Sequence, residues 1–252
     1  MCLCLFAIEQ HDEFPFILLA NRDEFRKRPS AKADFWKDEP QVLAGRDLQQ
    51  MGTWLGINKT GSLAFLTNYR DMNSLKPDAP SRGHLVSDFL IDGAQPKAYL
   101  KSIKKPDTYN GFNLVVGTPK QLFYYSNVKG RITPITAGIH GLSNALLNSE
   151  WPKSEEGKAA LSNAISENRL DSDNLFSILE NTSRPADKKL PKTGVSIDLE
   201  RVLSSRFINT PDYGTVCSTV IKIDRNNNYF FEERTFDKMG NVAGKVSFEM
   251  SV

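Results

Sequence analysis

The sequence predicts a single α+β domain over residues 1–252, with two packed sheets inside and helices outside. Strand patterns stand near both ends of the chain, and helical periodicity stands in the middle. Several strand segments are apolar at consecutive positions, which is typical of strands covered on both faces. Composition does not shift along the chain and no repeat is present, so one domain is expected.

The first two strands form a hairpin. Residues 2–8 are apolar, residues 10–13 make a polar turn, and residues 16–22 return. Asn21 and Asp23 share one face where the second strand ends, because strand side chains alternate, and Arg22 takes the other face.

Residues 25–50 are charged and contain Pro29 and Pro40, so this stretch is expected to be irregular. A second hairpin follows, with strands at 53–58 and 62–68. Like the first hairpin, it is expected in the central sheets.

The middle of the chain changes to a helical period. Ser81 can cap a helix at 82–91, where Leu85, Phe89 and Leu90 lie on one apolar stripe. Further helices are expected at 96–103, 155–166 and 174–180, and the polar residues 182–200 are expected to form a loop. Further strands are expected at 112–116, 122–126, 132–136, 216–223, 228–235 and, as an edge strand, 245–250.

Composition narrows the function classes. The chain has 32 basic and 30 acidic residues, a balance that argues against nucleic-acid binding. No apolar run approaches the roughly 20 residues of a membrane span, and no signal peptide is recognisable. The three cysteines cannot form a disulfide framework, and with three scattered histidines they lack metal-site spacing. A cytoplasmic protein without metal or cofactor is expected.

Cys2 is the most informative single residue. Removal of Met1 would leave its α-amine free, and with a pKa near 8 that amine can serve as the base for the thiol of the same residue. No histidine is then required, which suits a chain in which His11, His84 and His140 suggest no Cys–His pair. The alternative is an unreactive, buried strand cysteine, as is expected of Cys4.

Motifs along nearly the whole chain resemble the NRDE family, also called the transport-and-Golgi-organisation family. They run in order through Met1-Cys2, Asn21-Arg22-Asp23-Glu24, Gly52-Thr53-Trp54-Leu55-Gly56, Leu66-Thr67-Asn68-Tyr69, Ser81-Arg82-Gly83, Tyr109-Asn110-Gly111-Phe112-Asn113-Leu114, Gly141-Leu142-Ser143-Asn144, Trp151-Pro152-Lys153 and Tyr213-Gly214-Thr215.

More distantly, the chain resembles the bile salt hydrolases and penicillin V acylases, which are N-terminal-nucleophile hydrolases. The matching features are Asn21-x-Asp23, Thr67-Asn68-Tyr69, Ser143-Asn144 and Ser205-Arg206-Phe207. The resemblance implies a four-layer αββα sandwich with Cys2 as nucleophile.

It also implies that Asp23 holds the α-amine, Asn68 donates to the oxyanion, Asn144 positions the substrate or the amine, and Arg206 lowers the thiol pKa. Asn21, Arg22, Glu24 and Tyr69 are expected to bind substrate or support the site. The chain departs from the hydrolases at Ala20, where they carry arginine.

Two function classes follow. The first is an enzyme that hydrolyses or transfers the acyl group of an amide or thioester. The second is a non-enzymatic carrier, since the NRDE family has been associated with haem trafficking, lipid or acyl-CoA homeostasis and secretion. The same pocket would then hold haem, an acyl-CoA or another lipid. The sequence predicts neither the substrate nor the oligomeric state.

Overall fold

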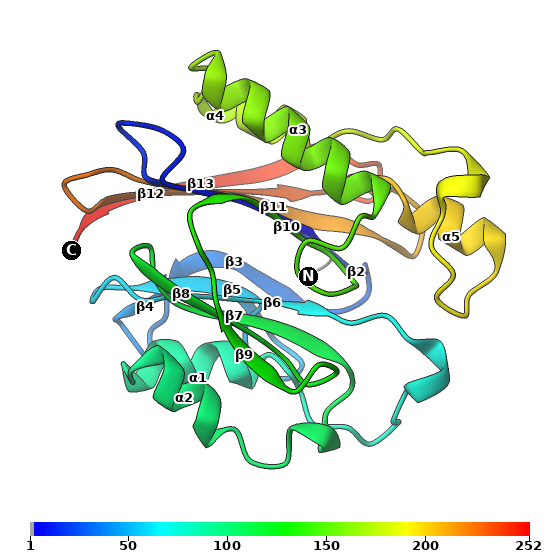
Figure 1. Ribbon diagram of the computed structural model, residues 1–252, viewed down its shortest axis with the longest axis horizontal. Helices are drawn as coiled ribbons and strands as arrows, with labels where there is room; N and C mark the ends of the chain where they lie inside the picture. Colours follow the sequence, from blue (N-terminus) through cyan, green and yellow to red (C-terminus); the bar gives the residue numbers. More distant parts are fainter. Residues whose placement is uncertain (1–2) are drawn as a thin grey trace.

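In the computed structural model, which describes residues 3–252, two antiparallel sheets pack face to face between two layers of helices (Figure 1). The six-stranded sheet has the order β10 (Gly138–Leu142), β1 (Leu3–Ile8), β2 (Phe16–Phe25), β11 (Tyr213–Ile223), β12 (Asn228–Phe236) and β13 (Val242–Ser251). The seven-stranded sheet runs in chain order through β3 (Ser30–Phe35), β4 (Val42–Asp47), β5 (Leu55–Asn58), β6 (Leu63–Asn68), β7 (Phe112–Thr118), β8 (Gln121–Ser126) and β9 (Arg131–Pro134).

Each sheet carries helices on its outer face. The six-stranded sheet is covered by α3 (Pro152–Ser166) and α4 (Ser172–Leu179), and the seven-stranded sheet by α1 (His84–Asp92) and α2 (Pro96–Ser102) (Figure 1). The chain also forms α5 (Ile197–Leu203) and the short 3₁₀ helices η1 (Met72–Ser74), η2 (Pro106–Thr108) and η3 (Asp187–Lys189). The result is the four-layer αββα sandwich that the resemblance implied.

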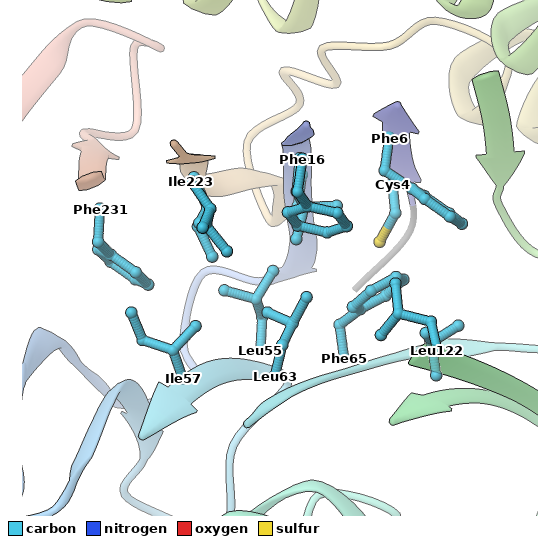
Figure 2. Packing of buried hydrophobic residues seen from close by; sticks show 14 of the residues in the cluster. Cys4, Phe6, Phe16, Leu55, Ile57, Leu63, Phe65, Leu122, Ile223 and Phe231 are labelled. Atoms are coloured by element: carbon cyan, nitrogen blue, oxygen red, sulfur yellow. The ribbon is translucent and has the colours of Figure 1, made fainter. Parts of the chain in front are cut away.

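The apolar strands are covered on both faces. In β1, Cys4 and Phe6 belong to the core between the sheets, whereas Leu3 and Leu5 pack under α3 and α4. In the inter-sheet layer, Phe16, Ile223 and Phe231 of one sheet lie opposite Leu55, Ile57 and Leu63 of the other (Figure 2). Burial of both faces explains why these strands show no apolar–polar alternation.

α3 approaches the sheet closely because it presents a glycine there. A Cβ atom at Gly157 would lie 2.6 Å from Leu5 Cδ1, so a larger residue would push the helix away from β1.

Three segments differ from the sequence prediction. Residues 25–50 contain β3 and β4, although they were expected to be irregular: β3 is an exposed edge strand with one buried residue, and β4 has only a short apolar run. Both are defined by pairing with their neighbours rather than by local pattern. Strand β10 was not predicted. The expected loop at 182–200 contains the start of α5, which Ser196 caps by accepting a hydrogen bond from Leu199 N.

Helix boundaries also moved. Ser81 does not cap α1, which begins at His84 after Gly83, and the Ser81 hydroxyl instead accepts from Gly83 N. α3 begins at Pro152, three residues before the predicted start, because proline is well tolerated at the first helical position. Among the helices of residues 3–252, none is both long and apolar enough to cross a membrane.

Candidate active site

The candidate site lies where β2 ends. Leu3, the first described residue of β1, pairs with Asn21 of β2, at the start of the Asn21-Arg22-Asp23-Glu24 segment. Cys2 itself lies outside the described residues. As the alternation predicts, Asn21 faces the helix layer, where it bonds to α4, and Arg22 faces the inter-sheet layer, where it contacts Trp54.

Asn21 fastens the end of β2 to its surroundings. Its side chain is fully buried, donates to the carbonyls of Leu179 and Arg206, and accepts from the Ser218 hydroxyl at 2.5 Å. A buried amide with these partners is held in one orientation. Asn21 therefore supports the site from behind.

Asp23 is oriented by a threonine on the neighbouring strand. Its side chain is 3% exposed, and its Oδ1 atom accepts from the Thr215 hydroxyl at 2.7 Å. The same hydroxyl accepts from Ile208 N at 3.0 Å, so Thr215 links the carboxylate to the loop before β11. Such fixing suits a carboxylate that must hold a charged partner in one position.

Four of the expected site residues line one pocket, which we call the Asp23 pocket. It has a volume of about 170 Å³, and its walls include Asp23, Asn68 and Asn144. Tyr69 lines it too. Three cationic side chains, Arg70, Arg82 and Lys153, line it together with the carboxylate of Asp71 and with Tyr213, and Met72, Leu75, Leu203 and Ile208 supply an apolar part. Residues widely separated in sequence thus meet in one cleft.

Asn144 and Asn68 are directly connected. The Asn144 side chain, 6% exposed, donates to Asn68 O at 2.9 Å, and the backbone carbonyl of Asn144 accepts from Arg70 N at 2.8 Å. Two bonds therefore tie the segment after β6 to residue 144. The Asn68 side-chain amide makes no hydrogen bond to any residue of the 3–252 range and lines the pocket, so its N–H groups can serve a ligand.

A second pocket adjoins the first, and we call it the Arg22 pocket. It has a volume of about 250 Å³ and is lined by Arg22, Glu24, Arg28, Asp47 and Trp54, among others. Asn68 and Arg82 line both pockets and form their common wall. Trp54 is 6% exposed and belongs to the inter-sheet core, and its ring also supports Arg22.

Arg206 does not line the Asp23 pocket. Its backbone carbonyl accepts from the Asn21 side chain at 2.8 Å. Its guanidinium side chain belongs to a residue that is 8% exposed and interacts electrostatically with Glu156. Burial lowers the pKa of its guanidinium below the usual value. Its connection to the site is through Asn21.

Sequence reasoning did not select Arg70, Arg82 and Lys153 as site residues. Arg82 and Lys153 stand inside the family motifs Ser81-Arg82-Gly83 and Trp151-Pro152-Lys153, which was the available signal. Arg70 follows the Asn68-Tyr69 motif. Its ion pair with the buried Glu200, at 3.1 Å, could not be predicted from the sequence around Arg70.

Comparisons with known proteins identify the family of this chain and proteins of similar fold. Residues 1–238 match the family model described as Transport and Golgi organisation 2. The mouse homolog of that name is 34% identical over 258 residues, and the human homolog is 35% identical over 258, with 93% of each chain covered in both cases.

Among solved structures, conjugated bile acid hydrolase from Clostridium perfringens, in two variant forms, covers 99% of this chain and 92% of its own. The TM-scores are 0.53 and 0.54, at 10% and 9% identity. At such identity the likeness shows the fold, which is that of the N-terminal-nucleophile hydrolases.

Proposed function

The chain belongs to the Transport and Golgi organisation 2 family, and we propose that this member is an N-terminal-nucleophile enzyme that cleaves an acyl amide or thioester with Cys2. The observation that carries the proposal is the convergence of Asp23, Asn68 and Asn144 on one pocket, beside the strand pair Leu3–Asn21 to which Cys2 is covalently joined. These residue types match what nucleophilic acyl transfer needs.

The proposed reaction starts once Met1 has been removed. The α-amine of Cys2 takes the thiol proton, and the sulfur attacks the substrate carbonyl carbon, which forms an S–C bond and an oxyanion. Asp23 holds the resulting ammonium. When the intermediate collapses, the bond to the leaving amine or thiol breaks and the ammonium proton goes to that group. Water, or an acceptor amine or alcohol, then attacks the thioester with the amine again as base, which releases the acyl group.

Asn68 is the proposed oxyanion donor, because its side-chain amide lines the pocket with its N–H groups available. Asn144 is a positioning residue, since its hydrogen bond to Asn68 O holds the end of β6 in place. The cationic Arg82 and Lys153 are proposed to favour thiolate and oxyanion alike, whereas the charge of Arg70 is paired with Glu200 and the Asp71 carboxylate opposes them. The lowering of the thiol pKa by the Arg206 guanidinium stays a prediction, and the backbone carbonyl of Arg206 anchors Asn21.

The second candidate function is a carrier of haem, acyl-CoA or lipid. It is favoured by the apolar wall of Leu75, Leu203 and Ile208, which could contact an apolar ligand. Pocket size is compatible with both candidates: volumes of about 170 and 250 Å³ are each below the roughly 300–1,000 Å³ of pockets for drug-sized ligands, but a cavity of about 420 Å³ shares Tyr69, Arg70, Asp71 and Asn144 with the Asp23 pocket. We place the protein in a reduced, cytoplasmic compartment, because a nucleophilic Cys2 must stay a thiol.

The test is acylation of Cys2. Met1-free protein is incubated with N-acyl amides and acyl thioesters, and intact mass and peptide mapping follow the acyl adduct. We expect an adduct on Cys2 that forms and then hydrolyses, and no turnover by Cys2→Ala, which should keep the fold. The buried Cys4 and Cys217 are internal controls. No adduct across the panel, together with tight binding of haem or an acyl-CoA, would favour the carrier.

A further inference from the structure

The Arg22 pocket contains a cation that is buried and yet poorly satisfied. Arg22 is 3% exposed, and within residues 3–252 its guanidinium makes one hydrogen bond, to the Ser30 hydroxyl at 3.3 Å. The carboxylates of Glu24 and Asp47 lie 3.9 and 4.0 Å away, which is too long for hydrogen bonds. A guanidinium has five N–H donors, so most remain available on the pocket side.

The two carboxylates in this pocket are engaged elsewhere. Asp47 Oδ2 accepts from Arg28 at 2.6 and 2.8 Å, and Asp47 Oδ1 accepts from the backbone amides of Gln49 and Gln50. Glu24 Oε1 accepts from its neighbouring amide, Phe25 N. With Arg82 on the common wall, three guanidinium groups and two carboxylates line this pocket. The charge of Arg22 is near Glu24 and Asp47 and also acts on the buried Glu233, but within residues 3–252 its guanidinium keeps only the one hydrogen bond to Ser30.

Two further features orient the Arg22 guanidinium and add positive potential to this pocket. The Arg22 guanidinium lies over the Trp54 ring, 4.1 Å from its centroid, which fixes its plane. The N-terminus of α1 reaches the same pocket through its N-cap residue, Gly83. This helix has no side-chain cap and no acidic residue in its first turn. A Cβ atom at Gly52 would lie 2.6 Å from Gly83 C, so glycine there is what lets this helix end come close.

We propose that the Arg22 pocket holds an anionic group, a carboxylate or a phosphate, on the leaving group of the substrate. This rests on the proposed function, in which the scissile carbonyl sits at Asn68 on the common wall of the two pockets. The apolar side chains of the Asp23 pocket, Leu75, Leu203 and Ile208, then take the acyl chain. The substrate class is an acyl amide or thioester whose leaving group is negatively charged, and Arg22 determines that specificity.

The experiment measures binding without turnover. The Cys2→Ala protein is titrated calorimetrically with N-decanoylglycine, its neutral counterpart N-decanoylglycinamide, and the phosphate ester of N-decanoylethanolamine. We expect one or both anionic compounds to bind roughly 10- to 100-fold more tightly than the neutral one, as for a charge-assisted hydrogen-bonded pair. Whichever anion binds more tightly identifies the source of the charge. Equal affinity for all three compounds would overturn the inference.

Variants assign the preference to Arg22. Adding Arg22→Gln to the Cys2→Ala protein should abolish it, whereas Arg46→Gln should keep it. Arg46 is the matched control, because it also stacks on a tryptophan, Trp36 at 4.2 Å, but does not line the pocket. If Arg22→Gln does not fold, Arg22→Lys should retain part of the preference and Arg82→Gln should reduce it. A preference that all of these variants keep would contradict the role of Arg22.

Turnover is measured separately, in the protein with Cys2 intact. Cleavage of the neutral and anionic amides with equal kcat/KM would support the proposed function and overturn this inference. An anionic preference in binding, without cleavage of any amide or thioester, would support the anion site and contradict the enzyme. The two proposals therefore fail in different assays.

Discussion

The layer between the two sheets has two unlike ends. Toward the β1–β2 turn it is filled by apolar side chains such as Phe16, Ile223 and Phe231 (Figure 2). Toward the end of β2 the same layer carries Arg22 and Cys217, which are register partners on neighbouring strands. Burial of apolar side chains stabilises the apolar end. At the polar end, burial removes water from charged groups, and only specific hydrogen bonds and ion pairs offset that cost. Stability and chemistry are thus concentrated at opposite ends of one layer.

Glu233 is the clearest example at the polar end. It stands on β12, and its carboxylate accepts from Ala33 N of β3 at 2.7 Å, so it bridges the two sheets. Burial raises the pKa of Glu233 to about 7, although the hydrogen bonds from Ala33 and Cys217 and the charge of Arg22 oppose this shift. The apolar side chains Phe16, Ile223 and Phe231 at the other end carry no titratable group.

The largest effect on stability is expected at the apolar end. Phe65 is fully buried and meets Phe6 edge to face, with ring centroids 5.4 Å apart. Phe65→Ala should lower the free energy of unfolding by about 3–5 kcal/mol, because it removes a buried ring and leaves a cavity. Denaturant unfolding measures this, with the exposed Val242→Ala as control. A loss below about 1 kcal/mol would contradict the role given to this core.

At the functional end the largest effect should fall on catalysis. Asn68→Ala should lower kcat by roughly 10²–10³ with little change in KM, because an oxyanion donor acts chiefly in the transition state. Its stability should change by less than about 0.5 kcal/mol, since its side chain bonds to no residue in the 3–252 range. A large rise in KM with unchanged kcat would identify a ground-state binding role instead.

Titration of Glu233 should change the free energy of unfolding with pH by an intermediate amount. Since its folded pKa of about 7 lies above the ordinary 4.5, its stabilising contribution is full below pH 4.5 and is lost as pH rises through 7. The shift corresponds to about 3 kcal/mol. Unfolding free energies of wild type and Glu233→Gln, compared from pH 4 to 8, should diverge in favour of the variant as pH rises. Parallel curves would show that Glu233 does not titrate there.

The smallest effect is expected for the link between the two asparagines. Asn144→Ala removes the hydrogen bond to Asn68 O and should cost about 1 kcal/mol of stability. Turnover should fall less than in Asn68→Ala, because Asn144 only positions that residue. The exposed Asn226→Ala, in the turn before β12, is the control. If Asn144→Ala lowered kcat more than Asn68→Ala, Asn144 would contact the reacting atoms.

Strong local patterns predicted most of the elements, and weak ones failed. The hairpin of β1 and β2 and the hairpin of β5 and β6 follow from apolar runs around polar or glycine-containing turns. β3 and β10 could not be predicted in this way. β3 is mostly exposed at a sheet edge and is defined by its pairing with β4. β10 contains Gly138, His140 and Gly141 and depends on β1, which is distant in sequence.

The candidate site divides in a similar manner. Alternation along β2 predicted that Asn21 and Asp23 share a face and that Arg22 opposes them. No local pattern predicts that Arg22 lies on Trp54, or that Asn144 reaches Asn68 O across 76 residues of chain. Those contacts depend on how the sheets and loops pack.

By itself, the sequence determined the strand and helix periodicities, the chemical types at the site, and the family whose motifs this chain carries. Packing decided that Asn68 and Arg82 form a wall shared by two pockets, and that the buried Arg22 makes only one side-chain hydrogen bond to residues 3–252. The physical reason is range. Periodicity is a property of neighbouring residues, whereas desolvation and charge compensation depend on every group that packing brings within a few ångströms.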